Sequence, residues 1–255
     1  MRKIIKYVML DILRNKIIIA YACLLVLLGF SLFNMNDSTD KGLLSLMNVV
    51  LIIVPLVSLV FSAIYLYNAT EFIELLVSQP IRRRDIWLSL FTGLAGSLAI
   101  AFLAGCSIPV LISGAMKEVG LLLFIGTLLS IIFAAIAMLA VVHTRDKARG
   151  IGLTTMLWLF FTLLFDGIVL FILFQFMDYP LEKAMIVMSM LNPIDLSRVI
   201  MLLQLDISAM MGVTSAVFRS AFGSPLGMGI AIAVLLMWVV LPLWSSLRTF
   251  QHKDL

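Results

Sequence analysis

The chain has 255 residues, of which 63% are hydrophobic and 13% are charged, and its mean hydropathy is +1.16. A soluble domain cannot bury so large an apolar share, so the composition indicates an all-α polytopic membrane protein. The apolar runs are continuous rather than alternating, which favours helices over membrane-spanning strands. The net charge of +4 requires no nucleic-acid partner, because the basic residues lie beside the apolar runs, where membrane topology places them.

Basic and apolar residues are interspersed at the start of the chain. Arg2, Lys3, Lys6, Arg14 and Lys16 lie among apolar residues that recur every three or four positions. A helix with this pattern has one charged face and one apolar face, which suits the plane of a membrane surface. Residues 1–16 therefore predict a cytoplasmic amphipathic interfacial helix that leads into the first span.

Six apolar runs are each long enough to cross a membrane as a helix. Five lie within residues 17–177, and the sixth covers residues 226–247, before a cytoplasmic tail at 248–255. Small residues in the third span (Gly93, Gly96 and Gly105) favour close helix packing. The predicted spans are Ile17–Phe33, Leu43–Tyr67, Trp87–Ile112, Val119–Val142, Ile151–Met177 and Leu226–Leu247.

The basic residues are divided unevenly between the two sides of these spans. The segments before the first span, between spans two and three, between spans four and five, and after span six hold thirteen Lys and Arg residues. The other connecting segments hold five. Because cytoplasmic loops carry the excess of basic residues, both termini are predicted to be cytoplasmic.

The segment 68–86, between spans two and three, combines an amphipathic helix with a membrane edge. Glu71 and Glu74 are one helical turn apart, and an apolar pair follows on the next turn. Pro80 is expected to end the helix, since the residue before a proline disfavours the α region. Three consecutive arginines at 82–84 mark the cytoplasmic surface. Two interpretations stay open: a helix at 70–79 that receives a push from a soluble partner, or an amphipathic loop that seats the two spans.

Residues 178–225 form a long segment between spans five and six. Asn192 and Pro193 predict a helix start, with asparagine as the cap, proline at the first position and Asp195 in the first turn. We expect two or three short helices within residues 181–221, lying at the outer membrane surface as a lid or docking platform. The alternative is a re-entrant pair of short membrane segments.

Asp166 is the only charged residue near the middle of a predicted span. A carboxylate at that depth is costly, so it is expected to face the bundle interior or a wet cavity. A contact to substrate or to a proton is one interpretation. The other is a structural carboxyl group, bonded to neighbouring hydroxyl groups or close enough to the outer surface to reach water.

Methionines are frequent in the outer segment and at its borders, among them Met185, Met188 and Met210. Thioethers can bind Cu(I), but methionine also lines adaptable apolar docking surfaces, and we prefer the second interpretation and predict no metal site. The sequence has no P-loop, HExxH or GxSxG motif, so we predict no catalytic residue. We also predict no cofactor in this subunit, because ATP and Mg²⁺ would be bound by a separate ATPase.

The order of these elements resembles the ABC-2 type permease subunits over the whole chain. The shared features are the amphipathic start, the six spans, the acidic helix between spans two and three, and the tail with Phe250, Lys253, Asp254 and Leu255. Two stretches are sharper and resemble the NosY family, the permeases of transporters that mature nitrous oxide reductase. They are LVSQPI at 76–81, and LNPIDLSRV at 191–199 with LDISA at 205–209 and Gly212.

The resemblance implies a set of partners and a role. Such permeases form homodimers in membrane lipid, each copy binds one NosF-like ATPase inside the cell, two in all, and the dimer carries a NosD-like periplasmic repeat protein. The complex serves assembly of the copper sites of nitrous oxide reductase, by exporting a sulfur species or by transmitting conformational change to the periplasmic partner. The permease itself is a non-catalytic subunit.

The resemblance also assigns residues to these contacts, and two rival functions remain. One rival is an ABC-2 permease that exports a peptide, drug or lipid, and the other is a non-transporting membrane anchor or assembly factor. The implied ATPase-coupling residues are Glu71, Phe72, Glu74, Leu75, Ser78 and Gln79. The implied periplasmic docking residues are Asn192, Asp195, Arg198, Asp206 and Met210.

Overall fold

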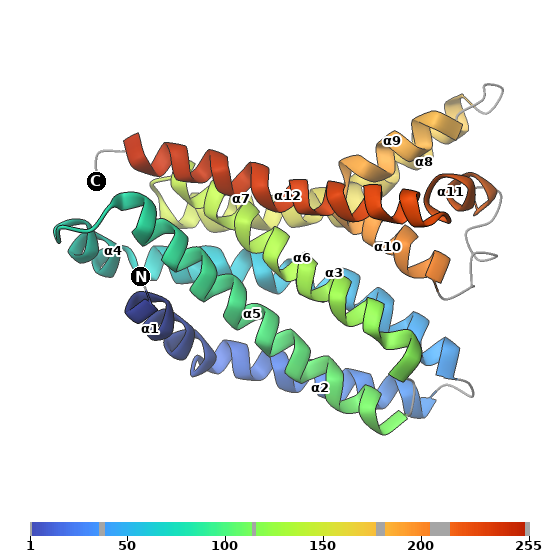
Figure 1. Cartoon of the computed structure of the whole chain (residues 1–255), viewed down its shortest axis with the longest axis horizontal. Helices are drawn as coiled ribbons and strands as arrows, with labels where there is room; N and C mark the ends of the chain where they lie inside the picture. Colours follow the sequence, from blue (N-terminus) through green and yellow to red (C-terminus); the bar gives the residue numbers. More distant parts are fainter. Residues whose placement is uncertain (1, 36–38, 114–115, 177–181, 205–214, 253–255) are drawn as a thin grey trace.

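The computed structural model describes residues 2–35, 39–113, 116–176, 182–204 and 215–252 (Figure 1). Within these ranges the chain forms helices and no strand. The helices are α1 Arg2–Leu13, α2 Lys16–Met35, α3 Thr39–Asn68, α4 Thr70–Val77, α5 Arg83–Ser113, α6 Met116–His143, α7 Lys147–Leu159, the π-helix η1 Phe160–Leu164, α8 Phe165–Gln175, α9 Glu182–Leu191, α10 Pro193–Gln204, α11 Ser215–Phe222 and α12 Pro225–His252.

Six helical segments of the described chain are long and apolar enough to cross a membrane. The predicted all-α polytopic fold is confirmed, and every predicted span corresponds to one of these segments. The ends differ by a few residues, because the helices continue into polar flanks such as Lys147 and His252. The segments are Lys16–Met35, Lys41–Asn68, Arg83–Val110, Val119–His143, Lys147–Gln175 and Pro225–His252.

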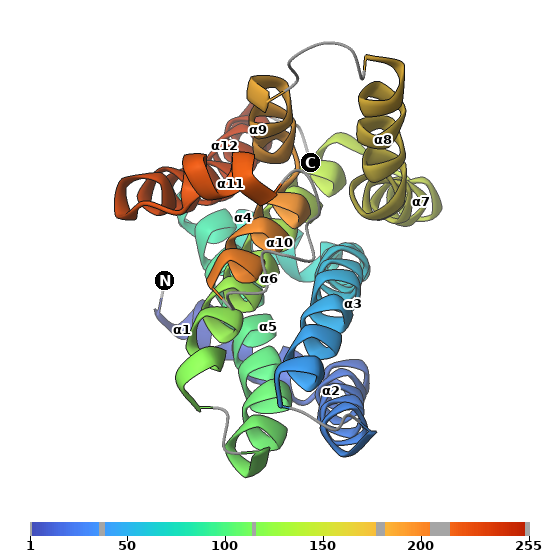
Figure 2. The same ribbon diagram turned by 90° about the vertical axis from the view of Figure 1, so that its right-hand side faces the viewer.

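Helix α6 is the centre of the bundle, and α3, α5 and α12 pack around it (Figure 2). Ile125, Phe133, Ala134, Ala135 and Met138 are buried and lie on different sides of α6, which is typical of a helix surrounded by others. Helices α1 and α2 both pack on α5. Small residues allow this approach, since a Cβ atom at Gly93 would lie 2.6 Å from Cγ1 of Val8 in α1.

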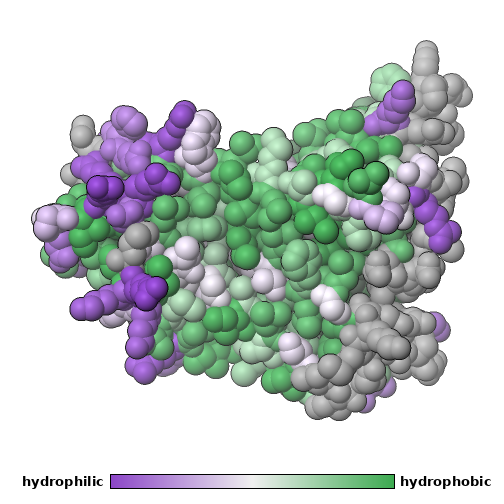
Figure 3. Space-filling model, viewed as in Figure 1, coloured by the Kyte–Doolittle hydropathy of each residue, from purple (hydrophilic) through white to green (hydrophobic). Residues whose placement is uncertain are grey.

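The described elements divide between two ends of the bundle. Helices α1 and α4, the turn between α6 and α7, and the end of α12 lie together at one end, here called the α4 end (Figure 1). Helices α9 and α11 lie at the opposite end. Hydrophilic residues gather at the α4 end, and hydrophobic residues cover the middle of the visible face (Figure 3). The segments predicted to be cytoplasmic therefore lie on one side, as an even number of spans requires.

Helices α9 and α10 form a sharp hairpin, bent by 116° at Asn192. We predicted short helices at the outer surface, but the structure places α10 against α3, α6 and α12. Leu196, Ile200 and Met201 of α10 are buried there, which gives the apolar face of this helix a protein partner. The outer docking platform and the re-entrant pair both stay predictions, since a membrane position for these helices does not follow from their packing.

Candidate functional site

Helix α4 is joined to α3 with a single residue, Ala69, between the two helices. The amide N–H of Ala69 donates to the carbonyl oxygen of Tyr65, and the N–H of Ile73 donates to the carbonyl oxygen of Ala69, each over 2.9 Å. The backbone hydrogen bonds thus run almost without interruption from the second span into α4. The helix ends at Val77, slightly before the predicted end at residue 79, because the chain turns through Ser78 and Gln79 before Pro80.

One face of α4 is fully open. Glu71, Glu74, Leu75 and Ser78 are exposed and follow the i, i+3, i+4, i+7 spacing of a single helix face, and Gln79 is exposed in the turn beyond. Leu75 is 65% exposed, so a large apolar side chain stands beside two carboxylates on this face. We call Glu71, Glu74, Leu75 and Ser78 the α4 outer face. This arrangement suits a protein contact that combines an apolar residue with acidic neighbours.

Phe72 does not belong to the α4 outer face, although the sequence suggested it as a coupling residue. Its ring lies 5.3 Å from that of Tyr7 in α1, and the side chain is half-buried. Ile73 and Leu76, which are buried, complete the inner face of α4. Phe72 therefore packs α4 against α1 and does not lie on the α4 outer face.

The end of α3, the turn between α6 and α7, the start of α5 and the end of α12 lie beside α4 and are joined by hydrogen bonds. The Tyr67 hydroxyl donates to the Thr144 carbonyl oxygen over 3.1 Å, and Lys147 Nζ donates to Asn68 Oδ1 over 2.7 Å. These bonds tie the turn between α6 and α7 to the end of α3. Trp87 Nε1 donates to Ser246 Oγ over 3.1 Å, and this bond joins the start of α5 to the last turns of α12.

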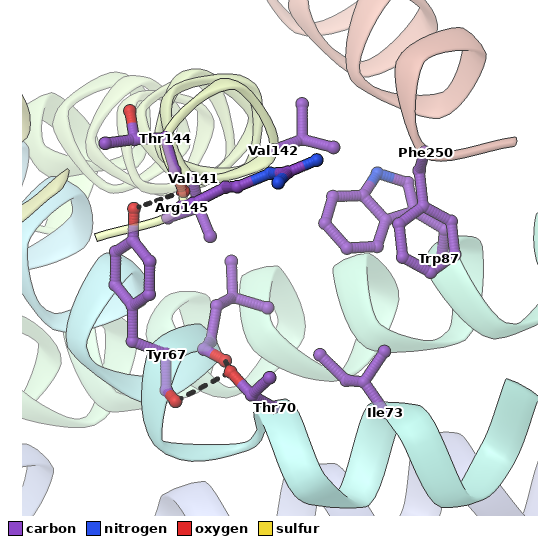
Figure 4. Close-up of a pocket in the computed structure, with 10 residues that line it drawn as sticks. Tyr67, Thr70, Ile73, Trp87, Val141, Val142, Thr144, Arg145 and Phe250 are labelled. Atoms are coloured by element: carbon purple, nitrogen blue, oxygen red, sulfur yellow. Dashed lines mark hydrogen bonds between the residues drawn. The ribbon is translucent and has the colours of Figure 1, made fainter. Parts of the chain in front are cut away.

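A pocket of about 310 Å³ lies behind α4, on the side away from its outer face (Figure 4). Thr70 and Ile73 of α4 line it, opposite the Trp87 and Phe250 rings, whose centroids are 4.3 Å apart. Figure 4 shows Arg145 extending from the turn after α6 across the pocket toward Trp87. The other lining residues are Leu66, Tyr67, Val141, Val142 and Thr144.

A charge cluster lies far from α4, in the half of the fifth span beyond the π-helix. Arg198 Nη1 is 3.0 Å from Asp166 Oδ2 and 3.0 Å from Asp195 Oδ1. Asp166 is nineteen residues beyond Lys147, about 28 Å along a helix that rises 1.5 Å per residue. The sequence treated Asp166 as an isolated site and Asp195 and Arg198 as docking residues, but the structure brings the three together.

The charge cluster borders a second cavity, of about 390 Å³, between α8 and the short helices α9, α10 and α11. Leu170 and Leu173 of α8 and Phe218 of α11 give it apolar walls, and Met185 and Ser189 of α9 complete one side. The side chains of Asp166 and Arg198 are each 33% exposed. Asp166 thus faces a partly open cavity and an arginine, which agrees with the predicted wet environment.

Asn192 occupies the bend of the hairpin and is 0% exposed. Its Oδ1 accepts a hydrogen bond from the Ile194 N–H over 3.0 Å, so the predicted cap is confirmed. Its Nδ2 donates over 2.8 Å to the carbonyl oxygen of Phe161 in η1. The Asn192 side chain is enclosed in this conformation, and its docking role stays a prediction.

Two further docking predictions, Asp206 and Met210, lie outside the described residues. Sequence reasoning missed the pocket behind α4, because its lining residues come from four distant segments. The pairing of Asp166 with Arg198 could have been predicted from the sequence. A carboxylate and a guanidinium that lie among apolar residues are each costly without a partner of opposite charge. Within the described residues no group of three or more His, Cys, Asp or Glu side chains is arranged to hold a metal ion.

In the part of the chain that the structure describes, six helices are long and apolar enough to span a membrane, and an open amphipathic helix lies between the second and third of them. No family model matches the chain. Over nearly its whole length the chain resembles permease subunits of ABC transporters.

Two curated relatives carry the name "Probable ABC transporter permease protein NosY". The protein from Pseudomonas aeruginosa is 28% identical over 257 aligned residues, which cover 92% of this chain and 90% of the relative. The protein from Stutzerimonas stutzeri is 26% identical over 268 aligned residues, which cover 95% of each chain. The resemblance to NosY, which the sequence indicated through its LVSQPI and LNPIDLSRV stretches, is confirmed.

Proposed function

We propose that this chain is the permease of an ABC transporter that couples cytoplasmic ATP hydrolysis to assembly of the copper sites of nitrous oxide reductase. The observation that carries the coupling role is the α4 outer face, on which Leu75 stands exposed beside Glu71 and Glu74. The names of the two relatives support the particular transporter. ATP and Mg²⁺ are bound and ATP is hydrolysed by a separate, NosF-like ATPase.

In this proposal the α4 end lies in the cytoplasm of a bacterium, and both chain termini lie there with it. The basic residues of the α4 end, among them Arg82, Arg84 and Arg149, support this orientation. Two copies of the chain form a homodimer that binds two ATPase subunits. A NosD-like repeat protein binds at the opposite end, in the periplasm.

The coupling step is mechanical. Closure of the ATPase pushes on the α4 outer face, and the short connection through Ala69 passes the displacement to α3. Helix α3 packs against α6 and α10, so the displacement reaches both α6, at the centre of the bundle, and the hairpin of α9 and α10. The outcome is either export of a sulfur species or a conformational change in the periplasmic partner.

An ABC-2 permease with a different cargo is the second candidate function. The cavity beside Asp166, Asp195 and Arg198 favours it, because a charged recess inside a membrane protein is a common place for a substrate to bind. A membrane anchor that moves nothing is the third candidate, and it gives no role to the α4 outer face.

A pull-down of the tagged chain from its native membrane in mild detergent separates these candidates. An ATPase together with a periplasmic repeat protein, identified by mass, is the expected result. The ATPase alone would favour an exporter of another cargo, and neither partner would favour the anchor. Leu75→Glu should release the ATPase, whereas Lys183→Glu, a charge change near the opposite end, should retain it.

A further inference from the structure

The pocket behind α4 is lined by residues whose hydrogen-bonding capacity can be counted. Four of its five side-chain donors are already used within the protein: the Tyr67 hydroxyl donates to the Thr144 carbonyl oxygen, and the Thr70 hydroxyl to that of Tyr67. The Thr144 hydroxyl donates to the Ala140 carbonyl oxygen, and Trp87 Nε1 donates to Ser246 Oγ. Among the side-chain donors that line the pocket, only the Arg145 guanidinium donates no hydrogen bond to the part of the chain that the structure describes.

The charge of Arg145 is also unbalanced among the described residues. The neighbouring carboxylate, Asp146, accepts a hydrogen bond from the Arg149 N–H and caps α7. Glu71 and Glu74 point away from the pocket, on the α4 outer face. A guanidinium presents five N–H donors in a planar fork that matches phosphate and carboxylate groups. Arg145 can therefore bind an anion at the exposed edge of the pocket.

The remainder of the pocket is apolar. Leu66, Ile73, Trp87 and Phe250 are buried and form its floor. The volume of about 310 Å³ corresponds to roughly ten water molecules at liquid density, enough for a small molecular fragment. The matching ligand is thus an amphiphile, with an anionic group at Arg145 and an apolar part against the floor.

The position of the pocket indicates the source of this amphiphile. Leu66, Trp87, Val141 and Phe250 belong to four different membrane-spanning segments, at the ends of those segments. The pocket therefore lies at the membrane surface, where basic pockets between spans bind anionic lipid headgroups. We propose that it is a binding site for the phosphate headgroup of an anionic phospholipid, held by Arg145.

A lipid headgroup bound in this pocket would contact α4 on the side opposite the α4 outer face. Thr70 and Ile73 form one wall of the pocket and belong to the same two helical turns as the α4 outer face. A bound headgroup fills the space into which α4 would otherwise retreat when it is pushed. This consequence rests on the proposed coupling function, whereas the binding site itself does not.

The test measures lipid retention by the chain alone, without an ATPase. The protein is placed in nanodiscs made of equal parts dioleoylphosphatidylcholine and dioleoylphosphatidylglycerol, released, and examined by native mass spectrometry for bound lipid. Wild type should retain phosphatidylglycerol in preference to phosphatidylcholine. Arg145→Gln should weaken this retention about tenfold, because it removes a charge-assisted hydrogen-bond donor.

Two matched variants make the result specific. Arg149→Gln removes an exposed arginine that does not line the pocket, and it should leave retention unchanged. Val141→Phe keeps Arg145 but fills the cavity, so it should lose the lipid as Arg145→Gln does. Equal losses in Arg149→Gln and Arg145→Gln would mean general surface attraction, and unchanged retention in Arg145→Gln or in a folded Val141→Phe would overturn the site.

Inorganic phosphate distinguishes a lipid from a free anion. If phosphate displaces the lipid at low concentration, or binds while phosphatidylglycerol shows no preference over phosphatidylcholine, the pocket is an anion site and the lipid assignment is wrong. A separate assay of ATPase stimulation with and without phosphatidylglycerol tests the effect on α4. Loss of that effect with retention intact would count against the coupling function and leave the site standing.

Discussion

Asn192 Nδ2 donates a hydrogen bond of 2.8 Å to the carbonyl oxygen of Phe161, and this contact joins the bend of the α9–α10 hairpin to the π-helix η1. A π-helical turn shifts the regular backbone pairing, which makes its carbonyl groups available to other donors. The same amide caps α10 through Oδ1. One side chain therefore satisfies backbone groups of two segments.

Replacing Asn192 should destabilise the protein in two separable steps. Asn192→Ser keeps a capping oxygen but is too short to reach the Phe161 carbonyl oxygen, and Asn192→Ala loses both contacts. We expect each lost hydrogen bond to cost about 1 kcal/mol or more, because the groups left behind are buried. Thermal unfolding in detergent should rank wild type above Ser and Ser above Ala. An Ala variant as stable as wild type would show that the contact contributes little.

The charge cluster should behave as a coupled unit. Arg198→Met leaves Asp166 and Asp195 facing each other without a cation, and we expect a loss of about 1 to 2 kcal/mol of stability. Adding Asp166→Asn to Arg198→Met should restore part of this loss, since it removes one of the two negative charges. A double-mutant cycle on unfolding measures the interaction, and strictly additive effects would contradict it.

The α4 outer face should tolerate substitution without loss of fold. Leu75→Asp, Glu71→Ala and Glu74→Ala alter exposed side chains, so stability should change by less than about 0.5 kcal/mol. Stimulation of the partner ATPase should fall in all three, most in Leu75→Asp, because an apolar anchor contributes more than a rim charge. Phe72→Ala is the opposite case: it removes a packed ring and should lower stability. ATPase stimulation at the wild-type level in Leu75→Asp would refute the coupling role.

Two glycines of α6 provide a matched pair for the packing of the bundle centre. A Cβ atom at Gly126 would collide with the Phe102 ring of α5, whereas nothing lies within 4 Å of the same position at Gly120. Gly126→Ala should therefore cost about 1 to 3 kcal/mol, and Gly120→Ala should be neutral or slightly stabilising. Gly126→Ala combined with Phe102→Leu should recover stability, because the smaller side chain removes the collision. Equal unfolding temperatures for the two alanine variants would contradict this packing.

The sequence predicted the features that depend on short-range patterns. Apolar runs gave all six spans, and the spacing of Glu71, Glu74 and Leu75 gave an exposed helix face. The cap at Asn192 followed from its position before Pro193. Each of these rests on neighbours within a few residues, so the sequence carries the information locally.

Features that join distant segments were not predictable in the same way. The hairpin of α9 and α10 looks amphipathic in sequence, and apolar residues at helical spacing suit a membrane surface as well as a bundle interior. Only tertiary packing against α3, α6 and α12 decides between them. The distinction between Phe72 and Leu75, one packed on Tyr7 and the other exposed, likewise depends on where α1 lies.

Pro55 divides helix α3 into two segments of similar length. Proline lacks an N–H and weakens the helix at that point, so bending concentrates there. The segment from Pro55 to Asn68 is about 20 Å long and the segment from Thr39 to Pro55 about 24 Å, at 1.5 Å per residue. In the proposed coupling, a push on α4 therefore acts first on the segment next to it, and the bend at Pro55 sets how much of the displacement reaches the other segment. Pro55→Ala stiffens this point, so we expect it to pass a larger share of the displacement along α3.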